Sequence, residues 1–298
     1  MTLSKMVESW IDRRSINRAP STISGYRTLL RLYIEPTGVG QADVADLDES
    51  DMIELLRPLL VRGCTRQAQL LQVLVMATLR DACRRRLIAW NPMDCVERIR
   101  HQSRLTPWLS VEQAQQLLRI SQANKDPLYV AWLLMLCCGL RRGEMLGLRW
   151  TDIDFDGGWL HVRRQKVRVD RAIIVSRPKS AASVRDIPLD EHILSLLRLL
   201  RRGDGDILDG VTDKTLQGGL DRACSAAGVP RVTLHGLRHT MAAAAAGDGV
   251  AIKILQGLMG HAHYTTTADI YAHVDSQPRR MAAAVIAETF VGARLEIV

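Results

Sequence analysis

The chain has 298 residues, of which 47% are apolar and 24% charged, and it carries a formal net charge of +8. That apolar content excludes a disordered chain, and the length favours two domains because single cores rarely exceed ~250–300 residues. The positive charge favours a polyanionic partner, such as nucleic acid.

The first hundred residues predict a bundle of helices joined by short turns. Apolar residues recur at three-to-four spacing, which is the period of a helix with one buried face. The expected helices are Leu3–Arg13, one capped by Ser21 and Thr22, Asp48–Leu60 and Thr65–Leu87, with a loop at residues 36–40.

Three consecutive arginines, Arg84, Arg85 and Arg86, end the last of these helices. They are either a solvated helix face or a set of phosphate contacts, and we carry them as candidate DNA-binding residues. The charge of the chain is spread rather than confined to a tail. Residues 1–105 hold 16 Lys and Arg against 12 Asp and Glu, and residues 106–298 hold 24 against 20. This distribution suits two domains that both touch DNA.

The second half predicts a mainly helical domain with a small antiparallel sheet. A polar, basic linker precedes Ser110-Val-Glu-Gln113, a capping box that opens a helix. Helical patterns continue to Arg149, alternate apolar residues at 159–189 indicate strands, and helices resume at Asp190.

Targeting and redox signals both favour the cytoplasm. The N-terminus lacks an apolar segment of signal-peptide length, and the longest apolar run, Pro127–Leu140, is too short to span a bilayer and is typical of a buried helix. The six cysteines form no CxxC pair, as expected of reduced thiols.

Six short motifs carry groups that suit phosphodiester chemistry. Attack on a phosphodiester by a hydroxyl needs fixed cations and proton donors around it. Guanidinium forks match phosphate oxygens better than an ammonium does, and residues three apart on a helix share one face. The motifs are Gly139-Leu-Arg141-Arg-Gly-Glu144, Pro178-Lys179-Ser180, Val184-Arg-Asp-Ile-Pro-Leu189, His235-Gly-Leu-Arg238-His239, Leu258-Met-Gly-His261 and Ile270-Tyr271.

In this order and spacing the motifs resemble those of the tyrosine recombinases, the phage-integrase family of site-specific DNA recombinases. The resemblance is specific over residues 106–275 and looser over 1–105, which is similar to that family's core-binding domain. It implies a helical core-type DNA-binding domain at 1–100, a linker at 101–107, and an α+β catalytic domain at 108–298 with a tail from about 275. The catalytic set that it implies is Arg141, Lys179, His235, Arg238, His261 and Tyr271.

The resemblance also implies the chemistry. Tyr271 would attack the phosphorus and form a 3′-phosphotyrosine, Lys179 would protonate the leaving 5′-oxygen, and His261 would hydrogen-bond the phosphate. No cofactor and no metal are implied. From the residues alone, Glu144 is placed to orient a guanidinium, and Arg142 points elsewhere and is expected at the surface or in a salt bridge.

A zinc helix is the main rival interpretation of the histidines. His235 and His239 have the spacing of two zinc ligands on one helix face, and His261, His263 and His273 follow. The zinc-protease pattern needs Glu directly after the first His, and Gly236 stands there instead. We therefore expect no metal, with His239 as a buried structural residue.

The resulting expectation is a site-specific recombinase or integrase that binds double-stranded DNA and assembles as a homotetramer on it, without a membrane. The C-terminal tail would dock on its own domain or in trans on a neighbour, and accessory DNA-bending or directionality factors would assist. The protein would be cytoplasmic and nucleoid-associated when bound to DNA. The alternatives are a Xer-like resolvase of chromosome or plasmid dimers, a type IB topoisomerase, and a non-catalytic DNA-binding regulator on a recombinase scaffold.

Overall fold

The computed structural model describes residues 1–101, 106–169, 172–178 and 181–260. The chain divides into two compact units. One contains residues 1–104 together with 168–172, and the other contains 105–167 and 173–298. Each unit has a hydrophobic core of its own.

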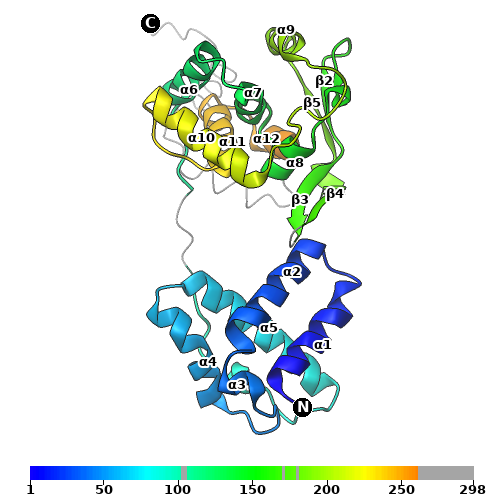
Figure 1. The fold of residues 1–298 in the computed structure, drawn as a ribbon, viewed down its shortest axis with the longest axis vertical. Helices are drawn as coiled ribbons and strands as arrows, with labels where there is room; N and C mark the ends of the chain where they lie inside the picture. Colours follow the sequence, from blue (N-terminus) through cyan, green and yellow to red (C-terminus); the bar gives the residue numbers. More distant parts are fainter. Residues whose placement is uncertain (102–105, 170–171, 179–180, 261–298) are drawn as a thin grey trace, which may run out of the picture. The chain divides into compact units, whose positions relative to one another are not determined.

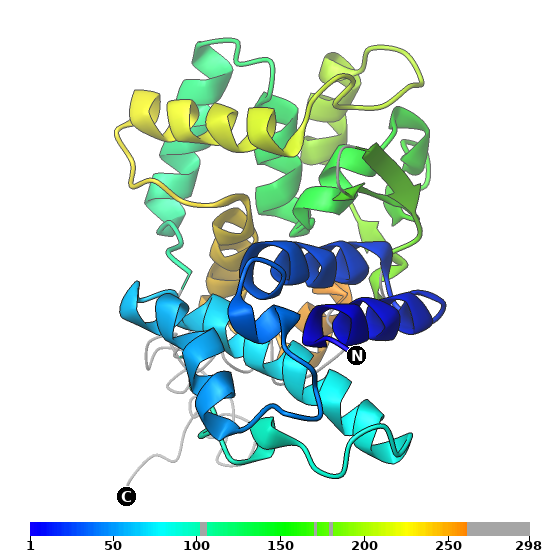
Figure 2. The same ribbon diagram turned by 60° about the horizontal axis from the view of Figure 1, so that its bottom comes forward.

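The N-terminal unit is helical (Figure 1). Helices α1 and α2 lie side by side, and α1 and α4 both pack on the long helix α5 (Figure 2). Its elements are α1 (Leu3–Ser15), α2 (Pro20–Leu29), a π-helical turn (Leu30–Ile34), α3 (Gly38–Gln41), α4 (Glu49–Val61), α5 (Thr65–Arg84) and a 3₁₀ turn (Pro92–Asp94).

Apolar stripes on these helices meet in one core. Each stripe repeats at helical spacing, so one face of the helix is buried while the other stays polar. Asp48 starts α4 because its side chain accepts hydrogen bonds from the backbone N–H groups of Ser50 and Asp51. The side chain of Asp51 in turn accepts from the backbone N–H of Asp48. The buried core side chains include Leu3, Val7, Ile11, Met52, Leu56, Leu71, Val75 and Leu79.

Two local predictions for this unit were wrong. Helix α2 begins at Pro20 with Ala19 as its N-cap, and no side chain caps it. Proline at the first helical position needs no such cap, because the N–H that it lacks would have had no partner in the helix. The expected loop at 36–40 contains the start of α3, whose N-cap Thr37 accepts the N–H of Gly40 at 2.9 Å.

The second unit has a helical layer beside a small sheet (Figure 1). Helix α7 packs on α11, and α6 packs on α10. The helices are α6 (Val111–Ala123), α7 (Tyr129–Cys138), α8 (Arg142–Gly147), α9 (Glu191–Leu200), α10 (Asp213–Ala227), α11 (Leu234–Gly247) and α12 (Ile252–Met259), with 3₁₀ turns at Trp150–Asp152 and Ala181–Ser183.

Helix α7 is the centre of this unit, and nine of its ten residues are buried. It is the apolar run expected to be a buried helix. Among the residues that the structure describes, no helix is long and apolar enough to cross a membrane. The predicted capping box is also present, because the hydroxyl of Ser110 accepts the N–H of Gln113 and the Gln113 side chain accepts the N–H of Ser110.

Four short strands lie within residues 159–189, where strands were predicted, and one further strand, at residues 153–154, precedes them. β2 pairs antiparallel with β1 and with β5, with Leu160 opposite both Ile153 and Ile187. These apolar residues face the helices. The strands are β1 (Ile153–Asp154), β2 (Trp159–Val162) and β5 (Arg185–Pro188) in one sheet, and β3 (Gln165–Val169) and β4 (Ala172–Ser176) in a second. The prediction of a mainly helical fold with a small antiparallel sheet is confirmed, with the difference that the strands form two sheets rather than one.

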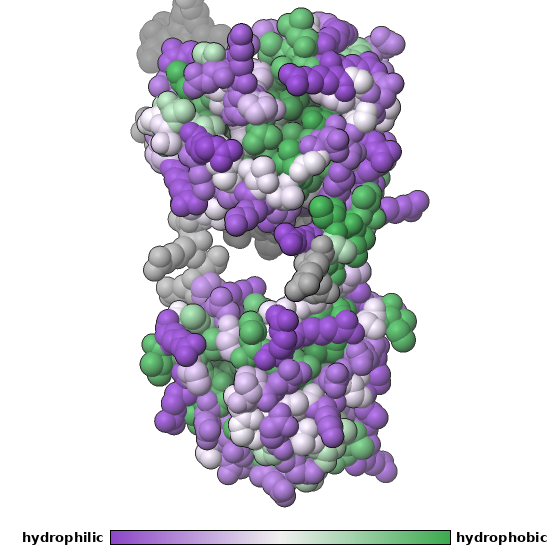
Figure 3. Space-filling model, in the orientation of Figure 1, coloured by the Kyte–Doolittle hydropathy of each residue, from purple (hydrophilic) through white to green (hydrophobic). Residues whose placement is uncertain are grey.

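Strand β4 is unusual because its apolar side chains face solvent. Ile173 and Val175 are 56% and 55% exposed. In the space-filling view the surface is mostly hydrophilic, and one of the green patches lies where β3 and β4 are drawn in Figure 1 (Figure 3).

Candidate active site

Helix α11 carries three of the basic side chains singled out in the sequence. Thr233 starts the helix by accepting the N–H of Gly236 at 3.0 Å. Residues three and four apart then share a face, which brings together His235, Arg238 and His239. The rings of His235 and His239 meet edge to face at 4.6 Å.

Arg238 is fully buried. Its Nη1 donates to the carbonyl oxygen of Gly139 at 2.5 Å, and its Nη2 donates to that of Met259 at 2.6 Å. Gly139 is the left-handed C-cap of α7, and Met259 is the last residue of α12. One guanidinium therefore closes two helix C-termini, where unpaired carbonyls and the negative end of the helix dipole favour a cation. Its Nε is buried and has no hydrogen-bond partner within the part of the chain that the structure describes.

Arg141 lies at the start of α8 and is about one-third exposed. Its Nη1 donates to Glu144 Oε1 at 2.7 Å and to Ser183 Oγ at 3.0 Å. Its Nη2 donates to the carbonyl oxygen of Gly260 at 2.6 Å. The expectation that Glu144 orients this guanidinium agrees with these contacts, and the two predicted arginines meet adjacent carbonyls, at 259 and 260.

Arg185 is the residue that sequence reasoning missed. It is buried at the start of β5 and holds both carboxylate oxygens of Glu144, at 3.1 and 3.0 Å. Its Nε donates to the carbonyl oxygen of Leu258 at 2.6 Å. The only signal in the sequence was its place in the motif Val184–Leu189, a strand pattern in which a buried arginine needs a buried acid that spacing does not reveal.

The electrostatic environment sets the charge of each group. Burial, followed by the charges of His239, Arg238 and Arg141, lowers the pKa of His235 to about 4, so this partly exposed ring is neutral at pH 7. Burial and the charge of Arg141 lower the pKa of Arg238 to about 9, which leaves it protonated. Burial alone would raise the pKa of Glu144, but the hydrogen bonds and charges of the arginines outweigh it and keep the pKa below its ordinary value.

The structure thus brings together three of the six predicted catalytic residues: Arg141, His235 and Arg238. The other three, Lys179, His261 and Tyr271, lie outside the described residues. His261 directly follows the glycine whose carbonyl binds Arg141. Arg142 is exposed and pairs with Asp213 at 3.1 Å, in accordance with its expected surface role.

The arginine triplet lies in the other unit. Helix α5 ends at Arg84, earlier than the predicted Leu87, because Arg86 takes a left-handed backbone with φ of 58°. All three arginines are exposed. Arg84 and Arg85 lie 3.7 and 4.0 Å from Asp81. Contact of these residues with DNA stays a prediction.

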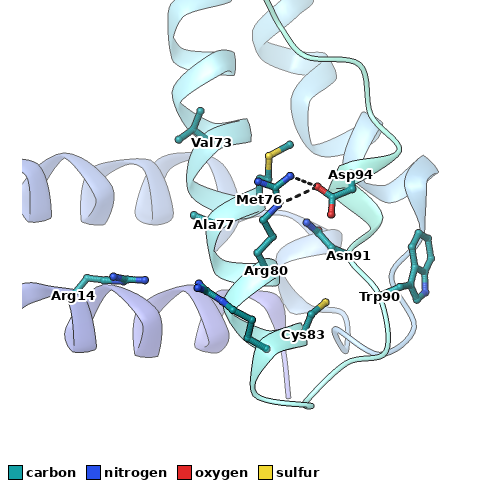
Figure 4. A pocket seen from close by; sticks show the side chains of 10 residues that line it. Arg14, Val73, Met76, Ala77, Arg80, Cys83, Trp90, Asn91 and Asp94 are labelled. Carbon is teal, nitrogen blue, oxygen red and sulfur yellow. Dashed lines mark hydrogen bonds and ion pairs between the residues drawn. The ribbon is translucent and has the colours of Figure 1, made fainter.

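A groove of about 810 Å³ lies beside this helix end. It is lined by Arg14, Arg80 and Arg84 around an apolar floor that includes Met76. Figure 4 shows Arg80 donating to Asp94, at 2.7 Å, inside the groove. The groove is therefore an extension of the surface formed by the arginine triplet, with Arg84 common to both and Arg80 already paired with Asp94.

Within the described ranges, no three His, Cys, Asp or Glu side chains come close enough together to hold a metal ion. Burial and the charge of Arg238 lower the pKa of His239. His239 is half-buried next to His235 rather than fully buried as expected.

A family model and several known proteins are similar to this chain in sequence. The model of the phage integrase family matches residues 107–278. A XerC-like tyrosine recombinase from Caldanaerobacter subterraneus subsp. tengcongensis is 29% identical over 59% of this chain and 54% of its own length. A putative prophage phiRv2 integrase from Mycobacterium tuberculosis is 29% identical over 85% of this chain and 70% of its own. The chain thus spans about half of the first relative.

Solved structures share the fold. The Tn1549 transposon integrase in complex with a circular intermediate DNA aligns with a TM-score of 0.81 at 22% identity, covering 96% of this chain and 99% of that one. A lambda integrase tetramer bound to a Holliday junction aligns with a TM-score of 0.71 at 17% identity, covering 93% and 78%.

Proposed function

The chain belongs to the phage integrase family, and from this membership and the site we propose that it is a site-specific DNA recombinase. It cuts and rejoins DNA strands through a 3′-phosphotyrosine intermediate. Integration of a mobile element is the preferred biological role, because the prophage integrase aligns over more of this chain than the XerC-like recombinase does. A Xer-like resolvase is the alternative that the latter relative favours.

One observation carries this proposal. The guanidiniums of Arg141 and Arg238 are fixed on the adjacent carbonyls of Gly260 and Met259. Among the described residues, nothing accepts a hydrogen bond from the buried Nε of Arg238. A phosphodiester oxygen would supply that acceptor. Two preorganised guanidiniums then meet the negative charge that develops on the phosphate oxygens in the pentavalent transition state.

The remaining roles follow from the chemistry of strand transfer. The phenol of Tyr271 gives up its proton to a base as its oxygen attacks the phosphorus, the bond from phosphorus to the 5′-oxygen breaks, and that oxygen takes a proton from Lys179. A deoxyribose hydroxyl later reverses the attack, so no bond energy is lost to water. His235 is neutral at neutral pH and can therefore accept or donate a hydrogen bond. His261, directly after the clamped Gly260, would donate to the phosphate.

The test is covalent trapping on a nicked suicide site, where the short leaving strand diffuses away. The wild-type protein should accumulate a protein–DNA adduct. Tyr271→Phe should bind the site with unchanged affinity and form none, because phenylalanine lacks the attacking oxygen. An adduct formed by the phenylalanine variant would overturn the assignment, and specific binding without an adduct by the wild type would favour the non-catalytic regulator.

The partners are proposed on the same basis. Double-stranded DNA would be held by a helical core-type DNA-binding domain at 1–100 and a catalytic domain at 108–298. The active form would be a tetramer on DNA, assisted by DNA-bending or directionality factors, in the cytoplasm and at the nucleoid.

The apolar segment Met281–Val291 would dock in trans. Deleting 279–298 should then impair synapsis and leave single-site binding intact, whereas an unfolded catalytic domain would indicate docking in cis.

A further inference from the structure

The end of α12 is held by three arginines from three different elements. The carbonyl oxygens of residues 258, 259 and 260 each accept one guanidinium hydrogen bond, and each of these bonds is 2.6 Å long. The donors are, in that order, Arg185 at the start of β5, Arg238 on α11 and Arg141 at the start of α8.

These contacts supply hydrogen-bond donors and positive charge to the C-terminus of α12. The last carbonyls of a helix have no partner within it, and the helix dipole makes that end attractive to cations. The backbone N–H of Gly260, in the left-handed conformation, caps only the preceding turn at Gln256 and Gly257. The three guanidiniums therefore fix where the chain leaves α12, one residue before His261.

Arg185 differs from the other two arginines. Each nitrogen of its guanidinium already donates to a protein oxygen, on Leu258, Ser183 or Glu144, so little donor capacity is left for a phosphate. Both oxygens of Glu144 are tied to it, and Glu144 Oε1 also accepts from Arg141. Arg185 is thus linked to the proposed phosphate-binding Arg141 through one shared carboxylate, and to the end of α12 directly.

Close packing supports the same link. A Cβ built on Gly260 would lie 2.8 Å from the carbonyl oxygen of Ala182 and 3.1 Å from Cδ of Arg185. The backbone at the end of α12 and the Arg185 side chain are in contact with no room for a methyl group, so a change in one displaces the other.

We propose that Arg185 is a positioning residue for strand cleavage. It holds Glu144 so that Arg141 faces the phosphate, and it anchors the end of α12 on which Arg141 and Arg238 also rest. This role rests on the proposed recombinase function, but the anchoring itself is a property of the protein without DNA.

The experiment compares Arg185→Met, Arg185→Lys and the double variant Glu144→Gln/Arg185→Met with the wild type, all as the full chain. Arg164→Met is the matched control, because Arg164 pairs at 2.9 Å with Asp152, a carboxylate that is 7% exposed, so the substitution removes a partly buried arginine from a different acid. The measurements are thermal midpoint, amide hydrogen exchange of the 252–260 peptide, DNA affinity, and single-turnover adduct formation on nicked DNA.

For Arg185→Met we expect faster exchange at 252–260 and cleavage slower by on the order of 10- to 100-fold, as for other remote misplacements of a catalytic group. DNA affinity should stay within about threefold, because the phosphate contacts remain. Arg185→Lys should recover part of the rate. The double variant should regain thermal stability, since no unpaired carboxylate is buried, while its cleavage stays slow.

The control variant should lose stability yet keep the wild-type exchange at 252–260 and the wild-type cleavage rate. Unchanged exchange in Arg185→Met would overturn the proposal, and so would a double variant that recovers rate together with stability. If the wild type itself forms no adduct, the recombinase proposal fails instead, and the exchange comparison still decides whether Arg185 anchors α12.

Discussion

At the scale of single residues, Arg238 is a buried cation that, among the described residues, donates hydrogen bonds to two carbonyl oxygens. It bridges the ends of α7 and α12 through Gly139 and Met259. Carbonyls at helix ends offer partial negative charge without neutralising the guanidinium. Its full charge therefore remains for a phosphate, whereas a carboxylate partner would compete with one.

Replacing Arg238 should consequently affect both stability and catalysis. In Arg238→Ala the two carbonyls lose their donor, at a cost of about 1–3 kcal/mol for each buried group left unpaired. Adduct formation should slow by about 10²–10³, as for one preorganised charge-stabilising donor. Arg142→Ala is the neighbouring control, since its side chain is 56% exposed in a surface ion pair. Urea denaturation and suicide-substrate cleavage measure the two effects, and equal losses in both variants would contradict this role.

The histidine beside it predicts a pH dependence. An unfolded histidine titrates near 6.5, whereas the folded pKa of His235 is about 4. Between these values the unfolded state takes up a proton that the folded state does not, so the stability contribution is complete above pH 6.5 and falls as the pH drops towards 4. The ring is partly exposed, and after allowing for solvent screening we expect a loss on the order of 1 kcal/mol.

That loss can be isolated by comparing the wild type with His235→Asn, which cannot titrate. Their difference in free energy of unfolding, measured by urea denaturation at pH 7 and pH 4.5, should change by the stated amount. Parallel pH profiles for the two proteins would show that His235 is not desolvated in the folded state.

The sequence singled out Arg141, His235 and Arg238 as catalytic candidates, through their resemblance to the family pattern, but not Arg185, and the reason is physical. The first three stand in short motifs whose spacing places them on helix faces or beside a glycine turn. The importance of Arg185 arises from Glu144, 41 residues away, and from a backbone carbonyl, 73 residues away. Local periodicity carries no information on such contacts.

At the scale of elements, the site depends on how its helices end. Gly139 ends α7 with φ of 59°, and this left-handed turn aims its carbonyl at Arg238. Glycine takes this conformation without the steric cost that a Cβ brings. A Cβ there would also lie 2.1 Å from Cε of Met241.

Gly139→Ala should therefore be destabilising for two reasons, strain and collision. The strain alone costs about 1–2 kcal/mol for a left-handed residue. Gly210→Ala measures the strain without the collision, because Gly210 has φ of 68° and open space where a Cβ would lie. The thermal midpoint should fall further for Gly139→Ala than for Gly210→Ala. A fall of the same size in both would mean that Met241 moves aside freely.

Element types followed from sequence more readily than element ends. The Ser110 capping box, the buried helix α7 and the strands around Leu160 all have strong local patterns. The short helix α3 was missed because Gly38 and Gly40 favour a loop by propensity. Tertiary packing decides there, since a Cβ on Gly40 would lie 1.9 Å from the carbonyl oxygen of Ile34.

At the scale of the whole molecule, each half has its own core and its own excess of positive charge. Residues 1–105 and 106–298 each carry four more basic than acidic residues, from counts of 16 against 12 and 24 against 20. Two basic units on one chain are suited to grip one polyanion together, because each phosphate neutralised releases counterions.

The DNA affinity of the full chain should accordingly fall steeply with salt, and residues 106–298 alone should bind more weakly with a shallower slope. The slope of log affinity against log salt is about 0.9 per neutralised phosphate in duplex DNA. Fluorescence anisotropy on a labelled site between low and moderate salt gives both slopes. Equal slopes would show that the first hundred residues add no phosphate contact.

The arginines around α12 bind main-chain oxygens, which every amino acid presents alike. Substitution at position 258 or 259 therefore leaves the guanidinium contacts in place as long as the helix forms. Inserting or deleting one residue within α12 is different, because each step along a helix turns the chain by about 100°. All three carbonyls would then point away from their arginines at once. Positions 258 and 259 should therefore tolerate substitution better than α12 tolerates the insertion or deletion of a residue.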